Sequence, residues 1–161
     1  MFTKRFLVVA ALTAIMLLVF SSTAGAMHFR HTFFANLSGG EEVPASGSLA
    51  RGMAIFQLSA DGSALSYRLS VANLEDTRVS HIHLAPAGAN GGVVVTLYGP
   101  ELIEGRFSGV LAVGTITAAN LSGALAGMPL SALVAELEAG NAYVNVHTLA
   151  FPGGEIRGQI R

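Results

Sequence analysis

Three histidines lie where β-strand geometry would gather their imidazoles. His81 and His83 flank Ile82, so an extended chain here directs both imidazoles to one face and the isoleucine to the other. His147 lies in a second alternating segment, residues 142–148, and shares a face with the outward positions of that segment. Neutral imidazole is a ligand for copper and zinc, so the spacing predicts a three-histidine metal site on an outer face.

Four polar residues are predicted to support these histidines from the same face. Tyr143 and Asn145 precede His147 at alternate positions of its strand, and a turn at 152–154 folds the last strand back beside them. That last strand also alternates, so its polar side chains join the cluster. The predicted supporting residues are Tyr143, Asn145, Glu155 and Arg157.

The same histidines are open to a second interpretation, in which they hydrogen-bond only to one another and to loop carbonyl groups and fix the loop at 86–92. Under the metal interpretation, copper is the preferred ion and zinc is the alternative. Binding is then expected to fade below about pH 6, because imidazoles take up protons there.

Other candidate residues have weaker patterns. His28 and His31 lie near the start of the mature chain, where a frayed terminus is expected. The pairs Glu41-Glu42 and Glu75-Asp76 lack the spaced oxygen ligands of a calcium-binding loop. Both pairs are therefore expected in solvated loops.

The first 26 residues have the pattern of a cleavable signal peptide. Lys4 and Arg5 form a basic head, residues 6–20 are an uncharged apolar run, and cleavage is expected after Ala26. An uncleaved anchor is the alternative, but this run is shorter than the roughly twenty residues that span a bilayer. The mature chain is expected to be secreted or periplasmic, without membrane association.

The composition narrows the class of protein. The sequence has no cysteine, which excludes disulfides and thiolate ligands, so the core alone must hold the fold. Removal of Lys4 and Arg5 leaves seven arginines against ten acidic residues, a formal charge of −3, which argues against nucleic-acid binding. Residues 27–161 have the length of one domain.

The periodicity predicts an all-β fold, an antiparallel β-sandwich or barrel of about eight strands with one short helix. The helix is expected at Leu130–Glu138, after Pro129 and before Gly140. The expected strands are residues 31–38, 49–59, 64–72, 79–84, 92–98, 107–117, 142–148 and 155–161.

Several motifs resemble the chordin (CHRD) domain family. They are Phe34-Ala35-Asn36-Leu37-Ser38-Gly39 with Glu42-Val43-Pro44, His81-Ile82-His83, Tyr143-Val144-Asn145-Val146-His147-Thr148 and Gly154-Glu155-Ile156-Arg157-Gly158-Gln159. They follow the family's order and span nearly the whole mature chain. The resemblance implies a secreted, compact β domain of the single-domain bacterial type. In animals, the family's repeats belong to an extracellular antagonist of growth factors.

A weaker likeness is to copper-zinc superoxide dismutase, whose metal lies outside a β-barrel and uses a His-x-His strand. His81 and His83 match that strand, and His147 could stand for a further ligand. The chain lacks the dismutase's cysteines and any histidine-rich zinc loop, so dismutation would require a copper-only site. This likeness implies an immunoglobulin-like or superoxide-dismutase-like architecture only.

Three functions stay open at this point. The first is a non-enzymatic exported domain that binds copper at the histidines. The second is an extracellular interaction or structural module, in which the same residues stiffen the fold and another surface meets a protein partner. The third is a copper-only, superoxide-dismutase-like enzyme in which Arg157 steers anions. The sequence does not indicate an oligomeric state.

Overall fold

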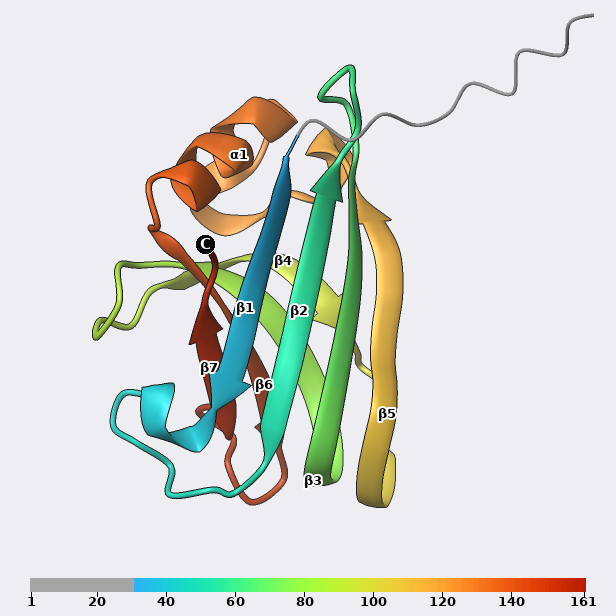
Figure 1. Cartoon of the computed structure of the whole chain (residues 1–161), viewed down its shortest axis with the longest axis vertical. Helices are drawn as coiled ribbons and strands as arrows, with labels where there is room; N and C mark the ends of the chain where they lie inside the picture. Colours follow the sequence, from blue (N-terminus) through green and yellow to red (C-terminus); the bar gives the residue numbers. More distant parts are fainter. Residues whose placement is uncertain (1–30) are drawn as a thin grey trace, which may run out of the picture.

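The computed structural model describes residues 31–161, so the expected signal peptide and His28 lie outside the described residues. Seven strands and one α-helix make up the regular structure of this part of the chain (Figure 1). Short 3-10 helices occur at Gly39–Glu41, Ala118–Asn120 and Gly123–Leu125. The strands are β1 (Thr32–Ser38), β2 (Arg51–Leu58), β3 (Leu65–Leu84), β4 (Gly92–Tyr98), β5 (Ile103–Ile116), β6 (Ala142–Thr148) and β7 (Ile156–Gln159), and the helix is α1 (Leu130–Glu138).

All strand pairs are antiparallel, and five strands close into a ring. The order is β2-β1-β7-β6-β3, and β2 pairs again with β3 to close the ring. β3 can serve at both ends because it is 20 residues long: its first half pairs with β2 and β5, and its second half with β6 and β4. The all-β prediction is confirmed, and the sheet is a barrel-like closed ring.

The structure has seven strands where about eight were expected, because the expected segments 64–72 and 79–84 belong to one continuous strand, β3. The residues between them contain turn-forming types, and Asn73 and Asp76 have positive φ angles of 59° and 49°. They lie at register shifts between β3 and β5, so the strand bulges here without ending. Short polar side chains tolerate this backbone conformation.

Alternation along the strands fills the ring with aliphatic and aromatic side chains. In β1, Phe33, Ala35 and Leu37 are buried, while Phe34 and Asn36 face outward. The resulting core holds the domain without crosslinks.

The helix α1 covers one end of the ring (Figure 1). It has the predicted bounds, and its buried residues Leu130, Leu133 and Leu137 follow helical spacing. Gly140, with a φ of 69°, follows the last turn. Within residues 31–161 this helix is too short, and no other is long and apolar enough, to span a membrane.

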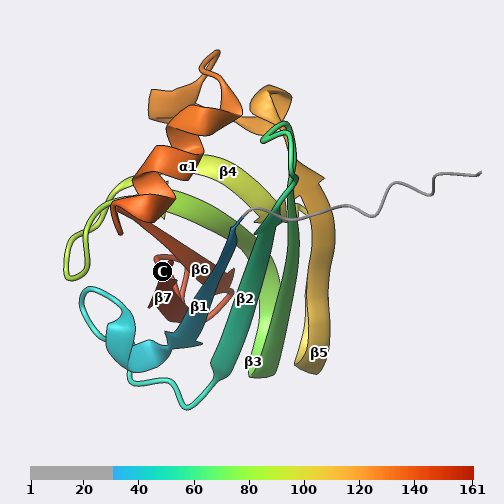
Figure 2. The same ribbon diagram turned by 45° about the horizontal axis from the view of Figure 1, so that its top comes forward.

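Two loops lie on the same side of the ring (Figure 2). They are the β1–β2 loop, residues 39–50, and the β3–β4 loop, residues 85–91. A hydrogen bond of 2.7 Å from Asn90 Nδ2 to the Val43 carbonyl joins them. The β3–β4 loop is also bound to side chains of β3 and β7, through the Gly91 and Ala89 carbonyls, and the β1–β2 loop is bound to Glu155, just before β7.

Candidate metal centre

The register between β3 and β6 brings the three predicted histidines together. His81 lies opposite Asn145, His83 opposite Tyr143, and His147 two pairs further along, opposite Val79. Directly opposed residues in an antiparallel pair share a face of the sheet. One ligand atom from each histidine can be chosen so that all three atoms lie within 4.8 Å of one another.

The distances suit a single ion after a small closure. His81 Nδ1 and His147 Nε2 are hydrogen-bonded at 3.3 Å. Two nitrogens bound to one tetrahedral ion at 2.0–2.1 Å are separated by about the same distance, 3.3–3.4 Å. Nitrogens that share one ion are at most about 4.2 Å apart. The widest pair, at up to 4.8 Å, would need to close by up to about 0.6 Å for two nitrogens on opposite sides of one ion, or by up to about 1.4 Å for a tetrahedral ion.

Backbone carbonyls fix the tautomers of two of the rings. His83 Nδ1 donates to the Gly91 carbonyl at 2.9 Å, and His147 Nδ1 donates to the Pro152 carbonyl at 2.9 Å. The Nε2 atom of each ring therefore keeps its lone pair. His83 Nε2 is buried and has no hydrogen-bond partner among the described residues. Metal-binding histidines have this arrangement, with the far nitrogen held by a carbonyl or carboxylate.

The surroundings keep the imidazoles neutral. Burial, with smaller effects of His147 and His83, lowers the pKa of His81 to about 4. Burial also lowers the pKa of His83 and of His147, against the opposing effect of their hydrogen bonds to Gly91 and Pro152. Neutral imidazole is the form that binds a metal ion, so at neutral pH all three rings are in the ligand form.

A stack of side chains supports His83 from the neighbouring strands. The Tyr143 ring is parallel to His83, with an interplanar angle of 8° and centroids 4.9 Å apart. The guanidinium carbon of Arg157 lies 3.4 Å from the Tyr143 ring centre. The inner histidine is thus held by its own strand, by β6 and by β7.

Arg157 is 1% exposed and binds the β3–β4 loop, so the hypothesis that it steers anions is wrong. Its guanidinium donates to the carbonyls of Ala89, at 2.8 Å, and Pro86, at 3.4 Å, and to Asn90 Oδ1 at 3.2 Å. Alternation placed this side chain on the polar face, but the loop covers that face and removes the guanidinium from solvent.

Glu155, another predicted supporting residue, holds the β1–β2 loop rather than a histidine. Its carboxylate accepts hydrogen bonds from Ser48 Oγ at 2.7 Å and from Thr148 Oγ1 at 2.6 Å. Its backbone carbonyl accepts a third from Ser46 Oγ at 2.6 Å. The residue fixes the loop that covers the polar face.

Glu42 is a site residue that the sequence interpretation missed. It was expected in a solvated loop, but it is 8% exposed, because the β1–β2 loop turns its side chain inward. Burial raises the pKa of Glu42 to about 7, although nearby Arg157 opposes the rise. Periodicity gives no direction for a loop residue. The available signal was its place in the Glu42-Val43-Pro44 motif.

A cavity of about 290 Å³ lies beside the cluster and gives access to His81 from the surface. Arg78, exposed at its edge, is the basic residue of this cavity. The full lining is Arg78, Val79, His81, Thr96, Tyr98, Gly99 and Pro100. His83 and Asn145 are buried, so an ion would be approached from the His81 side.

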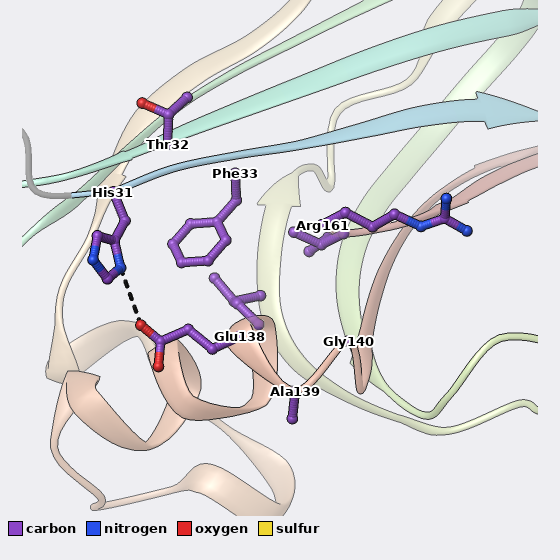
Figure 3. Close-up of a pocket in the computed structure, with 9 residues that line it drawn as sticks. His31, Thr32, Phe33, Glu138, Ala139, Gly140 and Arg161 are labelled. Atoms are coloured by element: carbon purple, nitrogen blue, oxygen red, sulfur yellow. Dashed lines mark ion pairs between the residues drawn. The ribbon is translucent and has the colours of Figure 1, made fainter.

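His31 is not part of the cluster. It lies at the start of β1, where its Nδ1 is 3.0 Å from Glu138 Oε1 at the end of α1 (Figure 3). The two residues border a cavity of about 630 Å³, with Phe33 on its wall and Arg161 on the side away from the ion pair. This cavity lies between the first strand and the helix, and none of the three clustered histidines lines it.

Comparison with known proteins identifies one family. The family model described as the CHRD domain matches residues 33–160, nearly all of the described chain. No curated protein and no solved structure matches the chain.

Proposed function

The chain belongs to the CHRD domain family, and on that premise we propose that it is a non-enzymatic, exported domain that binds one metal ion, copper in preference to zinc, through His81, His83 and His147. The ligand atoms are the ring nitrogens that face one another on the polar side of β3 and β6.

The observation that carries this proposal is the state of His83. Its Nδ1 is bound to a backbone carbonyl, while its Nε2 is buried without a partner in residues 31–161. An unpaired buried acceptor costs about 1–3 kcal/mol. A cation at Nε2 would remove that cost, which explains why the fold tolerates this atom.

The donor chemistry favours copper over softer or harder alternatives. Three imidazoles without a thiolate suit copper or zinc, whereas magnesium and calcium prefer oxygen ligands. The divalent affinity order places copper above zinc for a given site of this kind. The signal-peptide pattern of residues 1–26 supports a secreted or periplasmic location.

The test is calorimetric titration of the mature domain with copper(II) and, separately, zinc(II). We expect one ion per chain, with copper tighter, and loss of uptake in a His81→Ala/His83→Ala double variant. His31→Ala is the matched control, because His31 pairs with Glu138 of α1, away from the cluster, and its removal should leave uptake intact. A folded wild-type domain that takes up neither ion would refute the metal function.

A second candidate, an extracellular protein-interaction module, is favoured by a row of exposed residues on the outer face of the sheet, apolar except for one arginine. Phe34, Ile55, Arg68 and Val113 lie side by side across four strands. Phe34 is 50% exposed and Val113 63% exposed. Exposed apolar patches mark interaction surfaces. A folded domain without metal uptake would favour this candidate.

A further inference from the structure

We infer that the side-chain oxygen of Asn145 is a fourth ligand of the metal ion. This inference rests on the proposed function and extends it, because it gives the site a donor set of three nitrogens and one oxygen.

Asn145 occupies the middle of the cluster. It lies directly opposite His81 on β3, and His147 is two residues further along its own strand. On its other side it pairs with Arg157 of β7. The side chain is 2% exposed, so water has little access to it. Asn145 is thus the residue of β6 that directly faces His81.

Two buried acceptor atoms here lack donors. Asn145 Oδ1 and His83 Nε2 are both buried without a hydrogen-bond partner in the described residues. The Asn145 side chain is also within hydrogen-bonding reach of the His83 ring. Two neighbouring acceptors repel each other and each bears a desolvation cost. A single cation between them would satisfy both.

The amide has a defined orientation. A β-carbon built on Gly154 would lie 3.0 Å from Asn145 Nδ2 and would collide with Glu42 Oε1, so both atoms border the same small space. Glu42 Oε1 is itself a buried acceptor without a partner in the described chain. The amide nitrogen therefore lies on the Glu42 side, which leaves Oδ1 for the histidines.

The backbone of Asn145 is fixed as well. Ser80 Oγ donates to the Asn145 carbonyl at 2.7 Å, and both residues are buried. A ligand held this way needs little reordering when an ion binds, which lowers the entropic cost of binding. Three imidazoles with one oxygen form the tetragonal nitrogen and oxygen set that copper(II) accepts.

The alternative role for Asn145 is structural, with its side chain packed beside the His83 ring and no contact with the ion. The two roles differ in one measurable property. If Asn145 is a ligand, its removal opens a coordination position that water fills. If it is structural, the coordination of the ion is unchanged.

The experiment compares copper(II) loaded wild type with Asn145→Ala, Asn145→Asp and the control Asn36→Ala, whose side chain is exposed on β1. Copper affinity is measured by competition with a chelator. The electron paramagnetic resonance spectrum reports the donor set, and water-proton relaxation reports bound water.

We expect Asn145→Ala to weaken copper binding about 10- to 100-fold, to change the resonance spectrum and to increase water-proton relaxation. Asn145→Asp, which keeps an oxygen, should retain tight binding and low relaxation. Asn36→Ala should match wild type.

An Asn145→Ala domain with wild-type affinity, spectrum and relaxation would overturn the inference while leaving the three-histidine site intact. If Asn145→Ala does not fold, Asn145→Asp is the deciding variant. A carboxylate bound to copper would change the resonance spectrum relative to wild type. An Asn145→Asp spectrum identical to that of wild type would therefore show that the side chain does not bind the ion, and would overturn the inference. Absence of copper uptake by wild type would instead refute the proposed function itself.

Discussion

The Arg157 guanidinium carbon lies 3.4 Å from the centre of the Tyr143 ring. Tyr143 in turn stacks on His83, so a buried cation on β7 is connected through one aromatic ring to the innermost imidazole of the candidate metal centre. The same guanidinium donates to Ala89 and Asn90 in the β3–β4 loop. One side chain therefore links the loop that covers the site to the residues inside it.

Replacement of Arg157 by lysine should destabilise the domain although the charge is kept. An ammonium group cannot stack flat on Tyr143 or donate to three separate oxygens in the same geometry. We expect a loss of roughly 2–4 kcal/mol in the free energy of unfolding, measured by urea denaturation.

The control for this change is Arg68→Lys, at an exposed position of β3. It should alter the free energy of unfolding by less than about 0.5 kcal/mol. Equal effects of the two substitutions would show that the stack and the loop contacts of Arg157 contribute little.

Glu42→Gln should stabilise the domain at alkaline pH and not at acidic pH. The pKa of Glu42 is raised from 4.5 to about 7, so the folded state holds a proton that the unfolded state releases above pH 4.5. The stability that depends on this proton is complete below pH 4.5 and is lost as the pH rises to about 7.

The glutamine variant has no such loss, so at pH 8 it should be more stable than wild type by roughly 1–3 kcal/mol. Thermal or urea unfolding at pH 4.5 and pH 8 measures the difference. Glu41→Gln, at an exposed neighbour, should show no pH-dependent gain. A gain of equal size at both pH values would argue against a buried ionisable group.

Metal uptake should persist to a lower pH than the fading near pH 6 expected from unperturbed imidazoles. The pKa of His81 is lowered to about 4, and the pKa values of His83 and His147 are lowered in the same direction. Proton competition at His81 therefore begins further into acid. Copper titrations at pH 7, 5.5 and 4 should show tight uptake at the first two and weak uptake at the last.

The apo domain should lose stability over the same interval. Unfolded histidine takes up a proton below its ordinary pKa of 6.5, whereas folded His81 does so only near pH 4, so stability falls as the pH drops from 6.5 to 4. His81→Gln should flatten this dependence. An unchanged slope in that variant would place the proton uptake elsewhere.

Gly158→Ala should be strongly destabilising because the barrel closes tightly at this point. A β-carbon there would collide with the Asn36 carbonyl oxygen and lie 2.7 Å from the Asn36 carbonyl carbon, in the neighbouring strand β1. Backbone atoms cannot move aside as a flexible side chain can. We expect a loss of more than about 3 kcal/mol, measured by urea denaturation.

Gly153→Ala is the matched control, because a β-carbon at Gly153 would meet no atom within 4 Å. Its effect should lie within about 1 kcal/mol of zero. If Gly158→Ala is tolerated equally well, β1 and the C-terminal segment are held together less closely than the two hydrogen bonds between Phe34 and Arg161, just after β7, indicate.

The sequence by itself determined the features that depend on local periodicity. A period of two places His81 and His83 on one face of a strand whatever surrounds them, and a period of 3.6 after Pro129 predicted α1 with its observed bounds. The absence of cysteine likewise settled the kinds of ligand available.

Only the tertiary structure decided what covers the polar face and which strands meet. Alternation assigns a side chain to one of two faces, but it gives no depth of burial, because burial depends on loops distant in sequence. The β3–β4 loop buries Arg157, and the β1–β2 loop buries Glu42. The sequence predicted two strands where the structure has β3 alone, because the chain bulges at Asn73 without leaving the sheet. The long-range pairing of β3 with β6 brought His147 to His81, which no local pattern could fix.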